Sequence, residues 1–583
     1  MKFFKTFLAS LLGSLAALFA AFLLMFAFLG AIASIGSSEP IIPEKAILTI
    51  NLADGISEQT TEDIDIQGLL AGGNGMTNSL GIYDAIRAID AAAQDPGIPF
   101  IYLKCDNANI SIASCEELRK AIERFRQSGK PVIAYADNFT QGALYLASVA
   151  DKIYTAPLSN PMIQGLSSQI LFLKDLFDEL GVDIQLIRHG KYKSAGEQYI
   201  ASNISEANRE QQEAYLKGLW GAIARPICEG RNLDLNTFNQ MINDLKLSSA
   251  EDLVNAGLID SIITRQELRD LLCNQYGEED PDQVKTVDLG AYASVKVKED
   301  LKIKDKIAVL YANGQINGAD GEGITTNPMI QEIRKIREDE NIKAVVLRVN
   351  SPGGNAQTAE LIRKELELLG AEKPLIASYG DYAASGGYWI SAGTEKIYSN
   401  ATTLTGSIGV FSMIPNIGGA IRKIAHINPV SINTHKHSDM GTMRALDRTE
   451  TATMQNMVDD IYVQFVQLVA DGRQMSTEEV DAIAQGRVWC GEDALKIKLV
   501  DEIGGLEDAI RYAAIAAGLE EYRVSEFPKA KTGVEKLMES FGNASATFAS
   551  ISNPEQLIER LQEAAAGRNV YARLPYVVLD TNW

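Results

Sequence analysis

Short apolar runs alternate with amphipathic helical periods through most of the chain. In the first half this pattern predicts strands over 45–50, 100–105 and 131–135, with helices over 85–93 and 116–127. The second half shows the same order, with strands over 307–311, 344–349 and 374–378 and helices over 329–338 and 357–369. Strand-length runs that alternate with helical periods are typical of βαβ units. We therefore predict an α/β protein with mainly parallel sheets.

The two halves are repeats of each other. At an offset of 244 (342 − 98 = 244), the apolar run 98–104 falls on 342–348, and Lys-Ile-Tyr at 152–154 falls on the same three residues at 396–398. A period this long indicates a duplicated domain, because the units of solenoid proteins are several times shorter. A chain of 583 residues is also too long for a single core.

These patterns divide the chain into five parts. They are an N-terminal apolar segment over 1–40, a first α/β domain over 41–275, a linker over 276–303, a second α/β domain over 304–519 and a C-terminal tail over 520–583. The linker is predicted because its beginning, Gly277–Asp282, is polar and acidic. The tail has two amphipathic stretches, over 534–541 and 554–565, and we expect it to serve packing or subunit contact.

The N-terminal segment has the features of a membrane anchor. Lys2 and Lys5 precede an uncharged run from Thr6 to Ser38. A membrane span needs about 20 apolar residues, whereas the core of a cleavable signal needs only about 7–15. The basic flank predicts a cytoplasmic N-terminus and domains outside the cytoplasm. The alternative is a cleaved signal that ends near Ala31-Ile32-Ala33, but the length of the run favours an anchor.

Charge and cysteine content narrow the function further. The net charge of −22 argues against a nucleic-acid partner, since binding phosphates requires a basic surface. The five cysteines have no metal-ligand spacing, and we expect neither a metal nor a cofactor.

Two serines in the second half are candidate nucleophiles. Ser407 lies in the glycine-flanked apolar segment Thr405–Phe411, and Ser385 lies where a predicted strand gives way to a helix. Either hydroxyl could instead bond to its own backbone in an ordinary turn. The residues alone leave the choice between the two open.

A lysine in the first half is the candidate base. The chain has four histidines, all in two short stretches, so a Ser-His-Asp triad is possible but poorly supplied. A buried lysine can act instead, because desolvation lowers its pKa toward neutrality. Lys193 and Lys191 are equally plausible from local composition, although most loop lysines are simply solvated. Offset 244 places Lys193 on His437, so each half would supply one part of the site.

A glycine pair supplies a candidate oxyanion hole. Gly353 and Gly354 follow a predicted strand and open a helix, and the corresponding segment 106–110 of the first half lacks them. Such a turn leaves backbone N–H groups free to stabilise developing negative charge. The alternative is an ordinary βα turn.

Together these motifs resemble the family of bacterial signal peptide peptidases known as SppA or protease IV, in its long, duplicated form. The resemblance rests on Asn350–Gly354, Ala384–Trp389, Thr405–Phe411 and Lys191–Ala195. It implies two ClpP/crotonase-like domains, with Ser407 as nucleophile and Lys193 as base. Ser385 and Lys191 stay in reserve, because the nucleophile of the related Clp proteases lies nearer the position of Ser385.

The resemblance also implies a function. It is that of a serine endopeptidase that degrades cleaved signal peptides and other apolar peptides. We expect a homotetramer anchored in the bacterial inner membrane, with its catalytic domains on the periplasmic side. Two alternatives are a catalytically silent membrane scaffold and a crotonase-like acyl-transfer enzyme.

Overall fold

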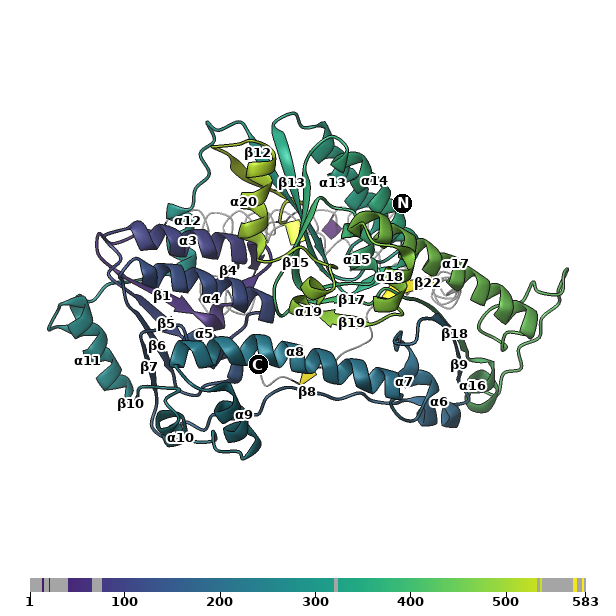
Figure 1. The fold of residues 1–583 in the computed structure, drawn as a ribbon, viewed down its shortest axis with the longest axis horizontal. Coiled ribbons are helices and arrows are strands. Elements are labelled where there is room, and N and C mark those ends of the chain that lie inside the picture. The colour runs from purple at the N-terminus through teal and green to yellow at the C-terminus, as the bar shows by residue number, and fades with distance from the viewer. Residues whose placement is uncertain are drawn as a thin grey trace, which may run out of the picture.

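The computed structural model describes residues 40–64, 76–318, 323–531 and 570–573, together with positions 13, 14, 20, 535, 536, 579 and 580. Within these ranges the chain forms two α/β units that lie side by side (Figure 1). Among the described residues no helix combines the length and the apolar character needed to cross a membrane. The anchor predicted over 6–38, and the amphipathic stretches predicted in the tail, fall almost entirely outside the described ranges.

The first unit is built on a parallel sheet of six strands. Its order is β10 (Ser261–Ile262), β7 (Lys152–Thr155), β6 (Val132–Ala136), β5 (Ile101–Lys104), β1 (Ile47–Asn51) and β11 (Thr286–Asp288). One face is covered by α3 (Ile82–Gln94), α4 (Ile112–Gln127), α5 (Gln141–Ala147) and α8 (Glu206–Arg231). Alternate strand residues such as Leu48 and Ile50 are fully buried under these helices, as a period of two requires.

The second unit repeats this order. Its strands are β20 (Glu502–Ile503), β16 (Lys396–Ser399), β15 (Leu375–Ala384), β13 (Ile342–Ser351), β12 (Lys306–Asn313) and β21 (Arg523–Phe527), all parallel. β17 (Leu404–Gly406) also pairs with β15, and β19 (Val488–Cys490) pairs antiparallel with β17. β16 lies 244 residues after β7 (396 − 152 = 244), which confirms the predicted repeat.

Helices cover both faces of the second sheet. One face is packed by α13 (Thr326–Glu338), α14 (Ala356–Gly370), α15 (Gly386–Ser391) and α17 (Arg448–Arg473), and the other by α20 (Leu506–Ala516). The shorter elements are β2 (Ile56–Ser57), β3 (Thr61–Ile64), β4 (Met76–Gly81), β8 (Ser167–Ser168), α6 (Lys174–Leu180), α9 (Leu235–Asn243), α10 (Ala250–Asn255), α11 (Arg265–Tyr276), α16 (Gly418–Ile424), α18 (Thr477–Ile483), α19 (Gly491–Lys496) and β23 (Leu579–Asp580).

The expected linker and tail both contribute edge strands. Residues 286–296 form β11 and the helix α12 (Leu289–Lys296), which packs on α3, and the start of the tail forms β21. β11 pairs with β1 as β21 pairs with β12, so the two segments play equivalent parts. Polarity alone misplaced these boundaries, because a short edge strand carries charged residues on its exposed side.

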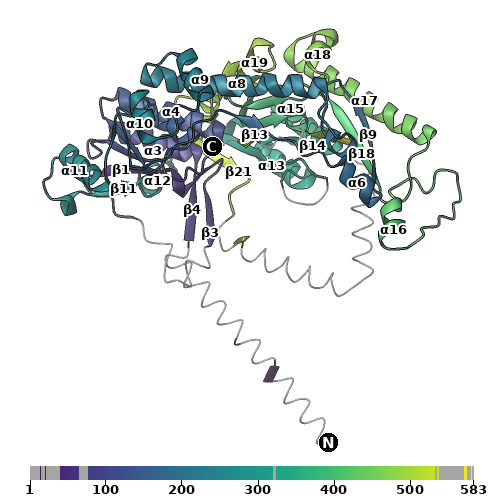
Figure 2. The same ribbon diagram turned by 90° about the horizontal axis from the view of Figure 1, so that it is seen from below.

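The first half also reaches across to the second. β9 (Asp183–His189) pairs antiparallel with β18 (Val410–Asn416) along its full length, at the opposite end of the molecule from α11 (Figure 2). β18 belongs to a four-stranded sheet in the order β14 (Gly353–Asn355), β22 (Val570–Arg573), β18 and β9. The segment that follows β9 is thereby held beside the second unit.

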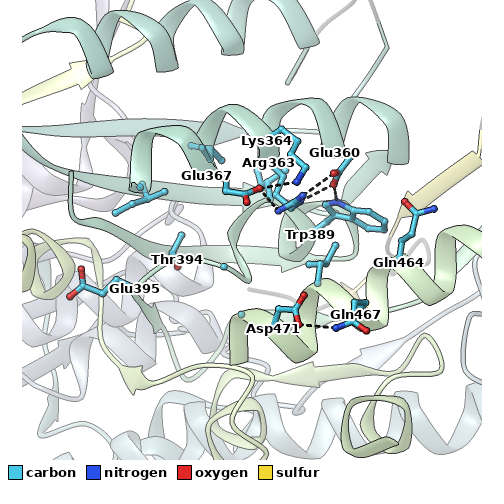
Figure 3. A pocket seen from close by; sticks show the side chains of 17 residues that line it. Glu360, Arg363, Lys364, Glu367, Trp389, Thr394, Glu395, Gln464, Gln467 and Asp471 are labelled. Carbon is cyan, nitrogen blue, oxygen red and sulfur yellow. Dashed lines mark hydrogen bonds and ion pairs between the residues drawn. The ribbon is translucent and has the colours of Figure 1, made fainter. Parts of the chain in front are cut away.

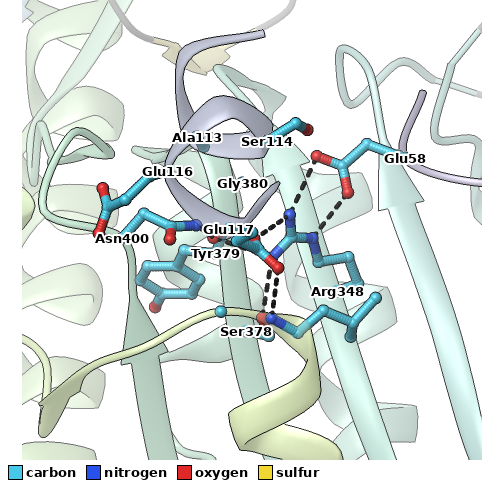
Figure 4. Close-up of polar contacts among 12 residues, drawn as sticks. Glu58, Ala113, Ser114, Glu116, Glu117, Arg348, Ser378, Tyr379, Gly380 and Asn400 are labelled. Atoms are coloured by element: carbon cyan, nitrogen blue, oxygen red, sulfur yellow. Dashed lines mark hydrogen bonds and ion pairs between the residues drawn. The ribbon is translucent and has the colours of Figure 1, made fainter. Parts of the chain in front are cut away.

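A buried ionic cluster joins the two halves at their centre. The guanidinium of Arg348 on β13 donates to Glu58 at 2.7 and 3.2 Å and to Glu117 on α4 at 2.9 Å (Figure 4). The side chains of all three are at most 7% exposed. Asn400 also donates to Glu117, at 2.9 Å. Because a buried charge without its partner is costly, this cluster fixes how the halves sit against each other.

Candidate active site

Lys193 lies in the turn between β9 and α7 (Glu197–Ile200), and its side chain points into the second unit. Three bonds hold the turn in place. Arg188 Nη1 donates to the Lys193 carbonyl at 2.9 Å, Gln211 of α8 donates to the Tyr192 carbonyl at 2.9 Å, and the Tyr192 N–H donates to the Gln485 carbonyl at 2.8 Å. Lys193 is completely buried.

Two glycines of the second unit close around the stem of this lysine. A β-carbon on Gly486 would lie 2.6 Å from Lys193 Cβ, and one on Gly409 would lie 3.1 Å from Lys193 Cδ. Gly486 also has a φ of +79°, in the left-handed region that favours glycine. The lysine can therefore follow this path only because both positions lack a side chain.

The amine of Lys193 meets two serine hydroxyls. Its Nζ lies 2.8 Å from Ser385 Oγ, 3.0 Å from Ser407 Oγ and 3.0 Å from the Ser407 carbonyl oxygen. Burial lowers the pKa of Lys193 well below its usual value. A neutral amine has two N–H groups and one lone pair, and the carbonyl can only accept. One of the two hydroxyls can therefore donate its proton to the lone pair.

Both serines reach the amine because their strands are in register. In the parallel pair β15–β17, Ala384 is opposite Gly406, and the serines are the next residue on each strand. Ser385 has a φ of +56° and Ser407 a φ of +49°. Positive φ is uncommon away from glycine, and such strain is retained mainly at functional sites.

The glycine loop lies beside Ser385. A β-carbon on Gly353 would be 2.6 Å from the Gly386 nitrogen, and one on Gly386 would be 3.1 Å from the Gly354 nitrogen. Two backbone N–H groups, those of Gly354 and Gly386, are thus close to the Ser385 hydroxyl. Ser407 differs in this respect, because its own N–H donates to the Arg487 carbonyl at 2.7 Å.

Lys191, the other candidate base, is not brought to the serines. Its side chain is 63% exposed, and its Nζ lies 3.2 Å from the Tyr192 hydroxyl and 3.9 Å from a carboxylate oxygen of Glu210. It is one of the solvated loop lysines that composition alone could not separate from Lys193.

A pocket of about 730 Å³ between α14, α15 and α17 is separate from this site (Figure 3). Its polar side chains pair among themselves. Glu360 accepts from Arg363 at 2.8 Å and from the Trp389 indole N–H at 2.8 Å. Lys193 and the two serines do not line it.

Sequence reasoning missed three glycines of the site. Gly386 could have been found from its place directly after a candidate nucleophile, at the start of a helix. Gly409 and Gly486 gave no local signal, because their role depends on a lysine more than 200 residues earlier in the chain (409 − 193 = 216).

Comparison with known proteins identifies the family. The sequence model of peptidase family S49 matches residues 124–276 and 367–520, one segment in each half. The chain is 32% identical to Protease 4 of Haemophilus influenzae, over 85% of this chain and 83% of that protein. It is 34% identical to Protease 4 of Salmonella typhi, over 79% and 76% of the two chains. It is 31% identical to the chloroplastic serine protease SPPA of Arabidopsis thaliana, over 78% and 68%. With its duplicated halves and its extent of similarity, the chain belongs to peptidase family S49 and is a serine peptidase of the protease 4 type.

Proposed function

We propose that the peptidase works through a serine–lysine dyad in which Lys193 is the general base and Ser385 is the nucleophile. The observation that carries this proposal is the buried Lys193 amine, 2.8 Å from a hydroxyl that adjoins the Gly354 and Gly386 N–H groups. A nucleophile must stand beside the donors that stabilise the oxyanion it creates. This condition favours Ser385 over Ser407, the residue that the family resemblance had favoured.

Ser407 has a different part in the proposal, as a positioning residue. Both its hydroxyl and its carbonyl lie 3.0 Å from the amine, and its N–H is bonded to the Arg487 carbonyl. These contacts orient the amine so that its lone pair faces Ser385.

The mechanism follows from these contacts. Neutral Lys193 removes the proton of Ser385 as Oγ attacks the peptide carbonyl, and the Gly354 and Gly386 N–H groups hold the oxyanion. The lysine ammonium then donates a proton to the leaving amine. A water molecule, activated by the same lysine, hydrolyses the acyl-enzyme. Gly353 contributes by leaving room for the carbonyl, since its φ of +91° and close neighbours admit no side chain.

The proposed substrates are apolar peptides, above all signal peptides left in the membrane after cleavage. Two features support this choice: the resemblance to signal peptide peptidases and the uncharged run 6–38, which would place the site beside a bilayer. We extend the proposal to an inner-membrane homotetramer with periplasmic domains, on the same resemblance. Membership in a peptidase family argues against the silent scaffold and the acyl-transfer enzyme.

Hydrolysis of a synthetic signal peptide by the full chain in detergent tests the proposal. We expect Ser385→Ala and Lys193→Met each to lower the rate at least about a thousandfold, and Ser407→Ala to lower it by about ten- to a hundredfold. Ser399→Ala is the matched control, because Ser399 is also completely buried but bonds only to the Asn400 carbonyl. A larger loss for Ser407→Ala than for Ser385→Ala would return the nucleophile to Ser407.

A further inference from the structure

We infer that the C-terminal strand of the chain occupies its own substrate cleft, and that the enzyme cleaves the Ala572–Arg573 peptide bond in itself. The inference rests on the proposed function. Its first support is the sheet order, in which β22 lies between β14, which carries the glycine loop, and β18, which follows Ser407.

β22 is paired as an extended substrate would be. It runs antiparallel to both neighbours, with Ala572 opposite Gly354 and Tyr571 opposite Phe411. Backbone pairing to exposed strand edges is a general way of binding peptides, and it gives affinity without demanding a particular sequence. In this position β22 fills the place between the two strands that any other extended peptide would need.

The Ala572 carbonyl lies at the proposed oxyanion site. Its oxygen is 2.2 Å from the point where a β-carbon on Gly353 would stand, and 3.1 Å from the corresponding point on Gly386. The Gly386 nitrogen is 2.6 Å from the first of these points. Of the carbonyls in β22, that of Ala572 is therefore the one presented to the nucleophile, and Arg573 begins the leaving group.

The side chains of β22 indicate which residues the cleft accepts. Ala572 is completely buried and Val570 is 8% exposed, and both pack into the core of the second unit. Tyr571 faces the other side, where its ring centroid lies 5.8 Å from that of Phe411. The cleft thus takes a small residue before the cleaved bond and an apolar residue two positions earlier.

The cleavage is an ordinary hydrolysis. Ser385 Oγ forms an ester with the Ala572 carbonyl carbon, and the bond to the Arg573 nitrogen breaks as that nitrogen takes the proton carried by Lys193. One water molecule then releases Ala572 as a carboxylate and restores the serine. The products are a chain that ends at Ala572 and the peptide 573–583. Until the bond is cut, β22 excludes other substrates, so hydrolysis of an added peptide begins with a lag.

The test follows the mass of the full chain in detergent, alone and with an added signal peptide. We expect wild type to convert to a species ending at Ala572, and Ser385→Ala to remain intact. Ala572→Asp should stay uncut and hydrolyse the added peptide without a lag, because a buried aspartate drives the strand out of the cleft. Arg573→Lys is the matched control and should be cut as wild type is. The rate constant should stay within about twofold on tenfold dilution, because cleavage occurs within one chain.

Each other outcome is decisive. Wild type that hydrolyses the added peptide but keeps residues 573–583 overturns the inference and leaves the proposed function standing. Wild type that cuts neither itself nor the peptide overturns both. A cut at Ala572 in Ser385→Ala assigns the cleavage to another nucleophile, and a rate proportional to concentration assigns it to a neighbouring chain. Either result overturns the inference.

Discussion

At the scale of single residues, two hydroxyls share one amine. The sequence predicted Lys193 and both serines, but the residues alone could not rank Ser385 against Ser407. The physical reason is that Ala384 and Gly406 are paired in β15 and β17, so the strands deliver two equivalent hydroxyls to the same place. What separates them is the neighbouring glycine loop, and that proximity cannot be read from the sequence around either serine. The assignment of Ser407 as nucleophile stays a prediction that this geometry does not favour.

The pH dependence of hydrolysis tests the lysine base. The active form is the neutral amine, and burial lowers its pKa, so activity should be retained at neutral pH and fall as the pH drops through that lowered value. Rates measured from about pH 9 to about pH 5 should show this decline. A flat profile over that range would rule out a lysine base.

The same profile tests the positioning role of Ser407. Its hydroxyl accepts a hydrogen bond from the ammonium form of Lys193, and that bond favours the charged state. Ser407→Ala removes the acceptor, which lowers the lysine pKa further, so the acid limb should move to lower pH. A Ser407→Ala enzyme that loses rate while its acid limb stays in place would argue for a merely structural serine.

Burial of the amine also predicts how stability varies with pH. In the unfolded chain the lysine keeps a pKa of about 10.4, so between the two values the unfolded state binds the extra proton. The stability of wild type should therefore rise with pH relative to Lys193→Met, up to about pH 10. Thermal unfolding of both proteins over this range measures the difference. Melting curves that shift in parallel with pH would contradict the lowered pKa.

At the scale of elements, sequence periodicity succeeded within each half and failed between them. The strands and helices of the βαβ units were predicted because each forms from a contiguous run with its own period. The β9–β18 ladder and the insertion of β22 were not, because they join segments more than 150 residues apart (410 − 189 = 221 and 570 − 416 = 154). The site depends on these long-range pairings, and for that reason it was predicted less completely than the fold.

Gly486→Ala tests whether packing around the lysine stem sets its aim. The added carbon would stand 2.6 Å from Lys193 Cβ, so the lysine turn must move, and we expect hydrolysis to fall at least about tenfold. Gly518→Ala is the control. Gly518 also has positive φ, at +66°, but has open space around it, so the strain without the contact should leave the rate unchanged. Equal rates in the two variants would contradict the steric argument.

At the scale of the whole molecule, the ionic cluster at Arg348 holds the halves together while the dyad forms between them. Lys193 comes from the first half and both serines from the second, so any rotation of one unit against the other separates them. Arg348 is also on β13, the strand that leads into the glycine loop. The cluster therefore connects the interface between the halves to the proposed oxyanion site.

Arg348→Met should be strongly destabilising, because it leaves two buried carboxylates without their cation. Such a loss costs roughly 3–5 kcal/mol, whereas an exposed pair contributes about 0–1 kcal/mol. Arg334→Met, which removes the half-exposed partner of Glu365 on the surface, is the matched control. Denaturant unfolding of both variants gives the comparison. A cost for Arg348→Met no greater than that of the control would mean that the cluster does not hold the halves.

The pairing of β9 with β18 has a consequence for how the protein is made. β9 ends at His189 and β18 begins at Val410, 221 residues later (410 − 189 = 221). At synthesis rates of about 5–20 residues per second, a nascent chain carries β9 for roughly 10–40 s before its partner strand exists. During that interval the chain has a lysine but neither serine, and it cannot digest the machinery that synthesises it. It also carries an unpaired strand edge, which makes newborn β9 a natural point of contact for a chaperone.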